Sequence, residues 1–246
     1  RERSDILNLE ELEELTGKAF PQARILRMDA DTTARKGGHE EILAAFSAHE
    51  ADILIGTQMI VKGHDFGNVT LVGIMAADLS LNTPDYRCSE RTFQLLTQAA
   101  GRAGRGSLSG NVVIQTYQPE HYAIVTAAEQ NYEEFYRREM LYRKMMNYPP
   151  ACYMEAVLFA GNNEKTVERC SDLALSTVRK MGYEENEIQM IGPVRAPVYK
   201  VNDIYRKILY IKSKNCDILD KIRRNIELLA AGDEGFKSLA LQFDIS

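Results

Sequence analysis

The chain has 246 residues, 45% of them hydrophobic, which is enough to bury the core of two domains or of one large one. Its formal net charge of -5 at pH 7 excludes a global basic field, so any nucleic-acid contact must come from local patches. The four cysteines lack metal-site spacing and no apolar run reaches membrane-span length, so we expect a cytoplasmic protein with reduced thiols and no membrane partner.

Helices and strands alternate in the predicted first half. Apolar residues at three-residue spacing predict an amphipathic helix over residues 4–16, and a second helix is predicted over 39–49. Short apolar runs at 24–28, 52–55, 69–76 and 111–117 are typical of buried strands. This alternation predicts an α/β fold with a parallel sheet covered on both faces.

Polar loops follow two of these strands. The strand at 52–55 leads into Thr57 and Gln58 and then into Lys62, and the run at 69–76 leads into Asp78. Because ligands bind at the carboxyl edge of open α/β sheets, we expect these loops to border one surface.

Two further loops each allow two interpretations. Residues 29–33 carry two acids and two hydroxyls, so Thr32 or Thr33 either caps the next helix or helps to hold a DNA phosphate. A charged loop is predicted over 79–91, where Tyr86 could stack on a base and Arg87 could neutralise a phosphate. Equally, Asp–Arg and Glu–Arg ion pairs in that loop could fix the segment that follows.

The segment 94–106 holds the densest candidate chemistry. If it is helical, Gln98, Arg102 and Arg105 stand four and then three positions apart and project from one face. Arginine suits phosphate because its planar donors bond two oxygens at once and keep their charge. Gly101 and Gly104 let another surface approach the backbone. The alternative is a surface helix with a glycine-rich end.

The second half has a different element order. A helical stretch over 121–147 carries an aromatic stripe that we expect to dock two domains together, and prolines stop it. A strand at 153–160, a helix at 164–181, strands at 187–191 and 206–213, a helix at 216–231 and a strand at 238–244 follow. This β-α-β-β-α-β order predicts a ferredoxin-like α+β domain.

Positive charge gathers in this second half. Residues 195–224 hold nine Lys or Arg against three Asp, a local excess of six, with Tyr199 and Tyr205 between them. This segment is either a solvated face, or a surface on which Lys200, Arg206 and Lys207 contact phosphate while aromatic rings stack on bases.

A family resemblance rests on two stretches. Residues 56–66 read GTQMIVKGHDF and residues 85–105 read DYRCSERTFQLLTQAAGRAGR. They resemble motifs V and VI of superfamily 2 helicases and, in detail, the family of primosomal replication-restart DNA helicases, most closely over 24–118. RMDADTT at 27–33 is similar to a recurrent element of that family and favours the phosphate interpretation of that loop.

The resemblance implies a domain organisation. No phosphate loop of the form Gly-x-x-x-x-Gly-Lys-Ser/Thr occurs, so we expect the C-terminal portion of a two-lobed motor. Residues 1–118 are then an incomplete second RecA-like lobe, 119–150 a helical linker and 151–246 a domain that binds DNA or partners. ATP and Mg²⁺ would be shared with a first lobe outside the chain, and zinc would lie only in a Cys-rich segment outside it.

The resemblance also implies residue roles. Arg105 is the expected arginine finger, Arg102 a second γ-phosphate contact, and Gln98 the group that orients phosphate or water. Gly63 and Asp65 would adjoin the nucleotide, with Asp65 binding ribose or pairing with an arginine of 94–106. The expected DNA contacts are Thr32, Thr57, Gln58, Lys62, Tyr86, Arg87, Lys200, Arg206 and Lys207.

The implied function is 3′ to 5′ unwinding at stalled replication forks, near the nucleoid. The implied partners are forked and single-stranded DNA, other primosome proteins, a helicase loader and single-strand DNA-binding protein. Two alternatives stay open: a non-enzymatic module that binds forks or docks partners, and a lobe of another superfamily 2 DNA translocase. Without a phosphate loop, the isolated chain is expected to lack ATPase activity.

Overall fold

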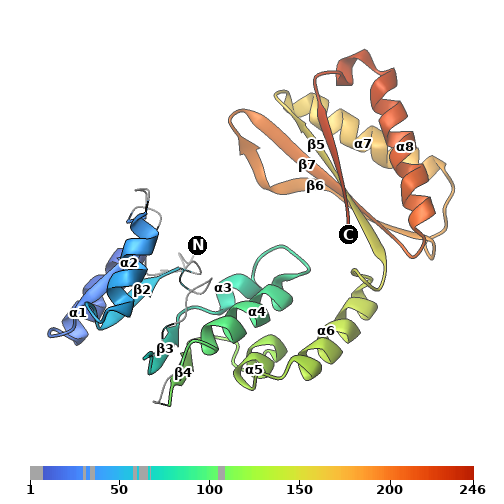
Figure 1. Cartoon of the computed structure of the whole chain (residues 1–246). Coiled ribbons are helices and arrows are strands. Elements are labelled where there is room, and N and C mark those ends of the chain that lie inside the picture. Colours follow the sequence, from blue (N-terminus) through green and yellow to red (C-terminus); the bar gives the residue numbers. More distant parts are fainter. Residues whose placement is uncertain are drawn as a thin grey trace. The chain divides into compact units, whose positions relative to one another are not determined.

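The computed structural model describes residues 8–29, 32–33, 37–57, 60, 66, 68–104 and 109–246. The chain divides into two compact units, Arg1–Phe135 and Tyr136–Ser246. The first is α/β with parallel strands, and the second is α+β with an antiparallel sheet (Figure 1). The predicted fold class is therefore confirmed in both parts of the chain.

The first unit begins with a parallel strand pair and its helices. Helix α1 (Leu9–Ala19) starts at a capping box, because the Asn8 side chain accepts from the Glu11 N–H at 2.8 Å and the Glu11 carboxylate accepts from the Asn8 N–H at 3.0 Å. Strand β1 (Ile25–Met28) pairs in parallel with β2 (Ile53–Gly56), and helix α2 (Gly38–Ser47) connects them. Met28, Leu43 and Phe66 form the core of this part.

Arg24 and Asp52 hold the starts of β1 and β2 together. The Asp52 carboxylate accepts from the Arg24 N–H at 2.8 Å, from its Nε at 3.1 Å and from its Nη2 at 2.9 Å. These bonds lower the pKa of Asp52 to about 2, and the bonds from the Arg24 side chain have the largest effect. A charge-assisted fork of this kind fixes the parallel register at its open end.

The rest of the first unit contains a second parallel pair. Strand β3 (Leu71–Ile74) pairs with β4 (Asn111–Ile114), and helices α3 (Asp78–Leu81), α4 (Cys88–Ala100) and α5 (Tyr122–Ala128) share a hydrophobic cluster against which Ile74 and Ile114 pack. The core is apolar and includes Phe93, Leu96, Ile124 and Phe135. In the described residues, β1–β2 and β3–β4 are two separate hydrogen-bonded sheets.

The predicted loop over 79–91 is wrong at both ends. Residues 78–81 are helical, and α4 begins at Cys88. Asp78, the first residue of α3, is buried, and its carboxylate accepts from the Thr116 hydroxyl at 2.7 Å and from the Tyr117 N–H at 2.9 Å. These bonds tie the exit of β3 to the exit of β4, which sequence spacing could not indicate.

The segment 94–106 is α-helical only as far as Ala100, where α4 ends. The Arg102 N–H donates to the Ala99 carbonyl at 3.0 Å and the Ala103 N–H to the Ala100 carbonyl at 3.1 Å, which tightens the last turn. Gly104 then adopts a φ of 74°, and its N–H donates to the Val69 carbonyl at 3.0 Å. A left-handed glycine of this kind ends a helix without steric cost.

Gly110 packs directly on this turn. A Cβ at position 110 would lie 2.2 Å from the Gly104 nitrogen and 2.5 Å from the Ala103 carbonyl carbon, which are backbone atoms. The turn that carries Arg102 and the segment that enters β4 are therefore in backbone contact.

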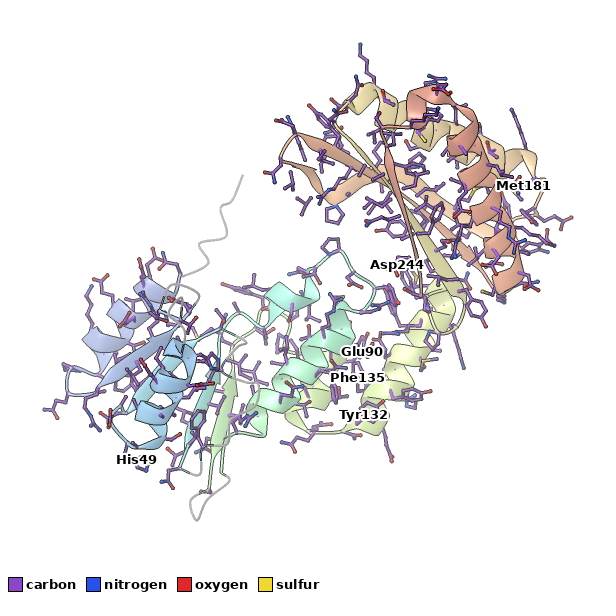
Figure 2. All side chains as sticks on the ribbon, turned by 45° about the horizontal axis from the view of Figure 1, so that its top comes forward. His49, Glu90, Tyr132, Phe135, Met181 and Asp244 are labelled. Carbon is purple, nitrogen blue, oxygen red and sulfur yellow. The ribbon has the colours of Figure 1, made fainter. Side chains whose placement is uncertain are left out.

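The predicted helical stretch 121–147 is interrupted. Helix α5 ends at Ala128 and α6 (Tyr132–Met146) begins four residues later, with Gln130 between them at a φ of 52°. Phe135, in the first turn of α6 (Figure 2), stacks on Phe93 of α4, with ring centroids 4.2 Å apart. The boundary between the two units falls within α6.

The second unit has the predicted order of elements. They are β5 (Tyr153–Gly161), α7 (Glu164–Lys180), β6 (Ile188–Val201), β7 (Ile204–Ser213), α8 (Cys216–Gly232), the short 3-10 helix η2 (Glu234–Phe236) and β8 (Ala240–Ile245). The sheet order is β6-β7-β5-β8, with antiparallel neighbours throughout. Helices α7 and α8 cover one face of the sheet (Figure 1), where Phe159, Leu209 and Ile222 are fully buried.

Residues 192–201 lie between the strands predicted at 187–191 and 206–213, and they are instead part of a strand. Strand β6 continues to Val201 and pairs with β7, with register shifts between Ile191 and Val194 and between Arg195 and Lys200. Asn202 and Asp203 form the turn, with φ values of 48° and 60°. Two left-handed residues suit the tight turn of a twisted hairpin, so β6 and β7 form one long hairpin.

Buried polar groups hold the second unit at two points. Glu155 of β5 is fully buried and accepts from the Arg223 Nε of α8 at 2.6 Å. Lys212 of β7 lies 3.7 Å from the centroid of the Tyr148 ring and donates to the Met146 carbonyl at 3.1 Å. The second contact secures the C-terminal end of α6 to the sheet.

No helix within the described ranges is long and apolar enough to cross a membrane. In the same ranges, no group of three or more His, Cys, Asp or Glu side chains could hold a metal ion.

Replacing Gly110 with alanine should destabilise the protein by about 1–3 kcal/mol, because the added Cβ meets backbone atoms that cannot rotate away. Urea unfolding followed by circular dichroism measures this loss. Gly73→Ala is the matched control, because a Cβ at that strand position meets nothing within 4 Å. Equal stability of the two variants would contradict the proposed close contact.

Replacing Arg223 with alanine should cost about 3–5 kcal/mol at pH 7, because it leaves the buried Glu155 carboxylate uncompensated. Burial already raises the pKa of Glu155 against the opposing effect of Arg223. Because the carboxyl pKa is raised in the folded state, the free energy of unfolding falls as the pH rises above the pKa of the unfolded state, about 4.3, and through the higher pKa of the folded state. The loss should therefore shrink between pH 7 and pH 4, whereas Lys221→Ala on the exposed face of α8 should show no such trend.

Candidate functional site

Gln98 and Arg102 lie on either side of the end of α4. Gln98 is on the exposed face of the helix, opposite the buried stripe of Thr92, Phe93 and Leu96. Arg102 is half-buried in the tightened turn, one turn beyond Gln98. Gln98 is therefore within the helix and Arg102 follows in the turn beyond its end. Arg105 lies outside the described residues.

Thr57 lies where β2 ends. Its carbonyl accepts from the Ile60 N–H at 3.1 Å. Only glycine fits at position 56, because a Cβ there would lie 2.6 Å from the Met28 carbonyl oxygen. The expected contacts Gln58, Lys62, Gly63 and Asp65 lie outside the described residues.

The loop of Thr32 borders the same sheet edge as Thr57, because β1 and β2 are parallel and Met28 pairs with Gly56. The Thr32 hydroxyl accepts from the Asp29 N–H at 2.9 Å, and the Asp29 carboxylate accepts from the Thr32 N–H at 2.7 Å. This is a local turn stabilised by its own side chains. Neither threonine caps α2, whose N-cap is Gly37 at a φ of 91°.

Asp78 follows β3, whereas Thr57 follows β2. In the described residues these two strands belong to different hydrogen-bonded sheets, so Asp78 and Thr57 do not lie at the edge of one common sheet. Burial pushes the pKa of Asp78 upward, and the hydrogen bonds from Tyr117 and Thr116 outweigh it, so its net pKa is lowered. Asp78 is thus an ionised structural bridge. The sequence indicated its position but not this role.

Tyr86 and Arg87 contact each other just before α4. The Arg87 Nε donates to the Tyr86 hydroxyl at 2.8 Å, and the guanidinium lies 4.9 Å from the ring centroid. Asp85 accepts from the Arg87 N–H at 2.9 Å and pairs with Arg91 at 2.8 Å. The Asp–Arg part of the hypothesised ion-pair network is therefore present, and it braces the first turn of α4.

The hairpin of β6 and β7 distributes its cations over two faces. Arg195, Lys200 and Lys207 share the face that packs toward the helices, because Arg195 pairs in register with Lys207 and Lys200 with Tyr205. Arg206, next to Lys207 in β7, points to the opposite face. The expected contacts Lys200 and Lys207 are thus together, and Arg206 is apart from them.

Carboxylates compensate the cations of the helix-facing side. Arg195 lies 3.8 Å from Glu164 and Lys207 lies 3.5 Å from Glu168, both on α7, and Lys200 lies 2.9 Å from Asp203. The hydrogen bond to Asp203 raises the pKa of Lys200 and lowers that of Asp203. The local excess counted over 195–224 is therefore partly cancelled by acids from outside that window.

Aromatic rings and cations alternate on the same face. The Tyr199 and Tyr205 ring centroids are 5.8 Å apart, with the Arg195 guanidinium 4.4 Å from the first ring and the Lys200 ammonium 4.8 Å from the second. The Tyr199 hydroxyl donates a short hydrogen bond to Glu164, which raises the pKa of Tyr199. Sequence reasoning missed Glu164 and Glu168, although two acids one helical turn apart were visible at the start of the predicted helix.

Two protein families match the chain. Residues 2–107 match the helicase conserved C-terminal domain, and residues 144–245 match the C-terminal domain of primosomal protein N. The first match contains β1 to β3 and α4 with its turn, and the second contains the whole ferredoxin-like domain.

Curated relatives agree with both matches. The replication restart protein PriA of Bacillus subtilis is 45% identical over 87% of this chain, and those of Synechocystis and Chlamydia pneumoniae are 42% and 38% identical over 78% and 83%. The chain spans about a quarter of the length of these relatives, 26%, 23% and 27% respectively. The chain therefore belongs to the PriA family of replication restart proteins, with a helicase C-terminal domain followed by a primosomal protein N C-terminal domain.

Proposed function

We propose that the chain supplies the second motor lobe and the C-terminal domain of an ATP-dependent 3′ to 5′ DNA helicase that restarts replication at stalled forks. The main observation behind this proposal is the turn after α4. Close backbone contacts at Gly104 and Gly110 hold this turn, which contains Arg102, against the residues that precede β3 and β4. The helicase match over residues 2–107 and the relatives' name support the same assignment.

The residues of this turn fit the phosphate end of ATP, because an amide at Gln98 and a guanidinium at Arg102 are donors suited to phosphate oxygens. Bound ATP with Mg²⁺ would supply the phosphoryl group whose transfer to water drives the motor. Within this proposal Arg105 acts as the arginine finger, Arg102 as a second γ-phosphate contact and Gln98 as the orienting group. The phosphate loop and the Mg²⁺ ligands would come from a first lobe outside this sequence, with Gly63 and Asp65 adjoining the nucleotide.

The DNA backbone would lie along the carboxyl edge of β1 and β2. Thr32 and Thr57 border that edge, and Gln58 and Lys62 follow Thr57 in the chain. Tyr86 and Arg87 would add a stacking surface and a charge next to α4. Because the DNA-contacting loop after β2 leads to Asp65, a change in lobe separation could alter the grip on DNA.

The second unit would contact forked and single-stranded DNA through Lys200, Arg206 and Lys207. Replication restart also implies other primosome proteins, a helicase loader and single-strand DNA-binding protein as partners, in the cytoplasm at the nucleoid. The compensation of Lys200 and Lys207 by carboxylates favours a second candidate, in which this unit docks a protein partner and leaves DNA to the motor lobes.

Replacing Arg105 with alanine in the full-length protein should lower the ATPase rate constant by about 10³-fold or more and leave the melting temperature unchanged. Arg102→Ala should also lower the rate. Steady-state ATPase assays with single-stranded DNA measure both effects. Arg179→Ala, an exposed arginine at the end of α7, is the control with the same charge loss. Full activity of Arg105→Ala would exclude the finger role, and the 246-residue chain alone should not hydrolyse ATP.

Replacing Lys200, Arg206 and Lys207 together with alanine should weaken DNA binding and lower the slope of log affinity against log salt by up to about three. Fluorescence anisotropy with labelled fork, single-stranded and duplex DNA at two salt concentrations measures this. A triple alanine variant of Arg179, Lys180 and Lys237 removes the same charge elsewhere in the unit. Unchanged affinity for every DNA would favour the docking candidate.

A further inference from the structure

Two glutamates of α7 hold the cationic hairpin. Glu164 and Glu168 stand one helical turn apart, so their carboxylates share a face. Glu164 accepts from the Tyr199 hydroxyl and lies 3.8 Å from Arg195, while Glu168 lies 3.5 Å from Lys207. The hairpin face that carries basic and aromatic side chains is thus occupied by acids of its own domain.

Three of the four charged side chains in these contacts are exposed. The side chains of Glu164 and Glu168 are 47% and 60% exposed and that of Arg195 is 71% exposed, whereas that of Lys207 is 14% exposed. Ion pairs in such surroundings contribute little to stability, because water and salt compete with each partner. They can therefore be exchanged for another anion without unfolding the domain, whose core lies beneath α7 and α8.

A phosphate backbone offers the same chemistry as the two glutamates. Carboxylate and phosphate oxygens both accept from guanidinium, ammonium and phenol donors. One helical turn separates the two carboxylates by about 6 Å along the helix axis, so they form a short row of negative charge. Arg195 also lies over the Tyr199 ring, and its departure would uncover a π-face on which a base could stack.

We propose that Glu164 and Glu168 are an intramolecular substitute for phosphate. They occupy Arg195, Tyr199 and Lys207 in the absence of DNA and release them when single-stranded backbone displaces the carboxylates. This inference rests on the proposed function, because it requires the hairpin to contact DNA. It assigns α7 an autoinhibitory role that lowers affinity for any anion too weak to displace both carboxylates.

The test is a double variant, Glu164→Gln with Glu168→Gln, in the complete 246-residue chain. Labelled single-stranded DNA should bind the variant about threefold to tenfold more tightly than the unchanged protein at low salt. Salt also weakens the internal ion pairs of the unchanged protein. The affinity of the unchanged protein for single-stranded DNA should therefore fall less steeply with salt than the affinity of the variant. The two affinities should therefore converge as salt rises, which a purely structural role of the glutamates does not predict.

The matched control is Glu184→Gln with Glu185→Gln, which changes the net charge equally at two exposed positions. Glu168→Gln alone is a second test variant, and thermal unfolding checks that each variant is folded. If the double variant binds DNA no more tightly than the unchanged protein or than the control variant, the inference is overturned. The proposed function still stands in that case if the unchanged protein binds DNA. If neither protein binds DNA, the DNA role of the second unit fails and the inference fails with it.

Discussion

Backbone contact without an intervening side chain determines the geometry of the turn that follows α4. The turn after α4 lies against Val69 and Gly110, and both contacts require glycine: Gly104 for its left-handed backbone and Gly110 for the absence of a Cβ. Because the turn joins the end of a helix to the entries of two parallel strands, it fixes the location of Arg102. Gly104 and Gly110 thus position Arg102, although neither glycine carries a charge.

Asp78 and the pair of Tyr86 with Arg87 extend this framework around α4. Asp78 connects the exits of β3 and β4 through Thr116 and Tyr117, and Asp85 braces the first turn of α4 through Arg91. Charged groups therefore stabilise the helix before it reaches Gln98. These contacts connect α4 to the strand exits on one side and to the segment that precedes it on the other.

The basic side chains of the second unit have partners in two kinds of surroundings, one buried and one more exposed. Arg223 pairs with the buried Glu155 carboxylate, where removal of one partner is costly, and Lys212 is itself buried against the Tyr148 ring. Arg195 and Lys207 are instead paired with glutamates of α7, and the Arg195 side chain is 71% exposed, so that its partner can be exchanged. A count of basic residues treats all four alike, yet among them Arg195 is the residue whose side chain is mostly exposed.

The sequence by itself determined the element order, the ferredoxin-like pattern and the family, because hydrophobic periodicity and the motif letters are local properties. It also located Gln98, Arg102 and the cationic hairpin. Only the tertiary structure decided that α4 stops at Ala100, that β6 runs through the expected connection to Val201, and that Asp78 joins two strand exits. The same holds for Glu164 and Glu168, whose partners are distant in sequence. Each of these depends on a backbone approach or an ion pair between segments far apart in the chain, and spacing along a sequence carries no signal for such contacts.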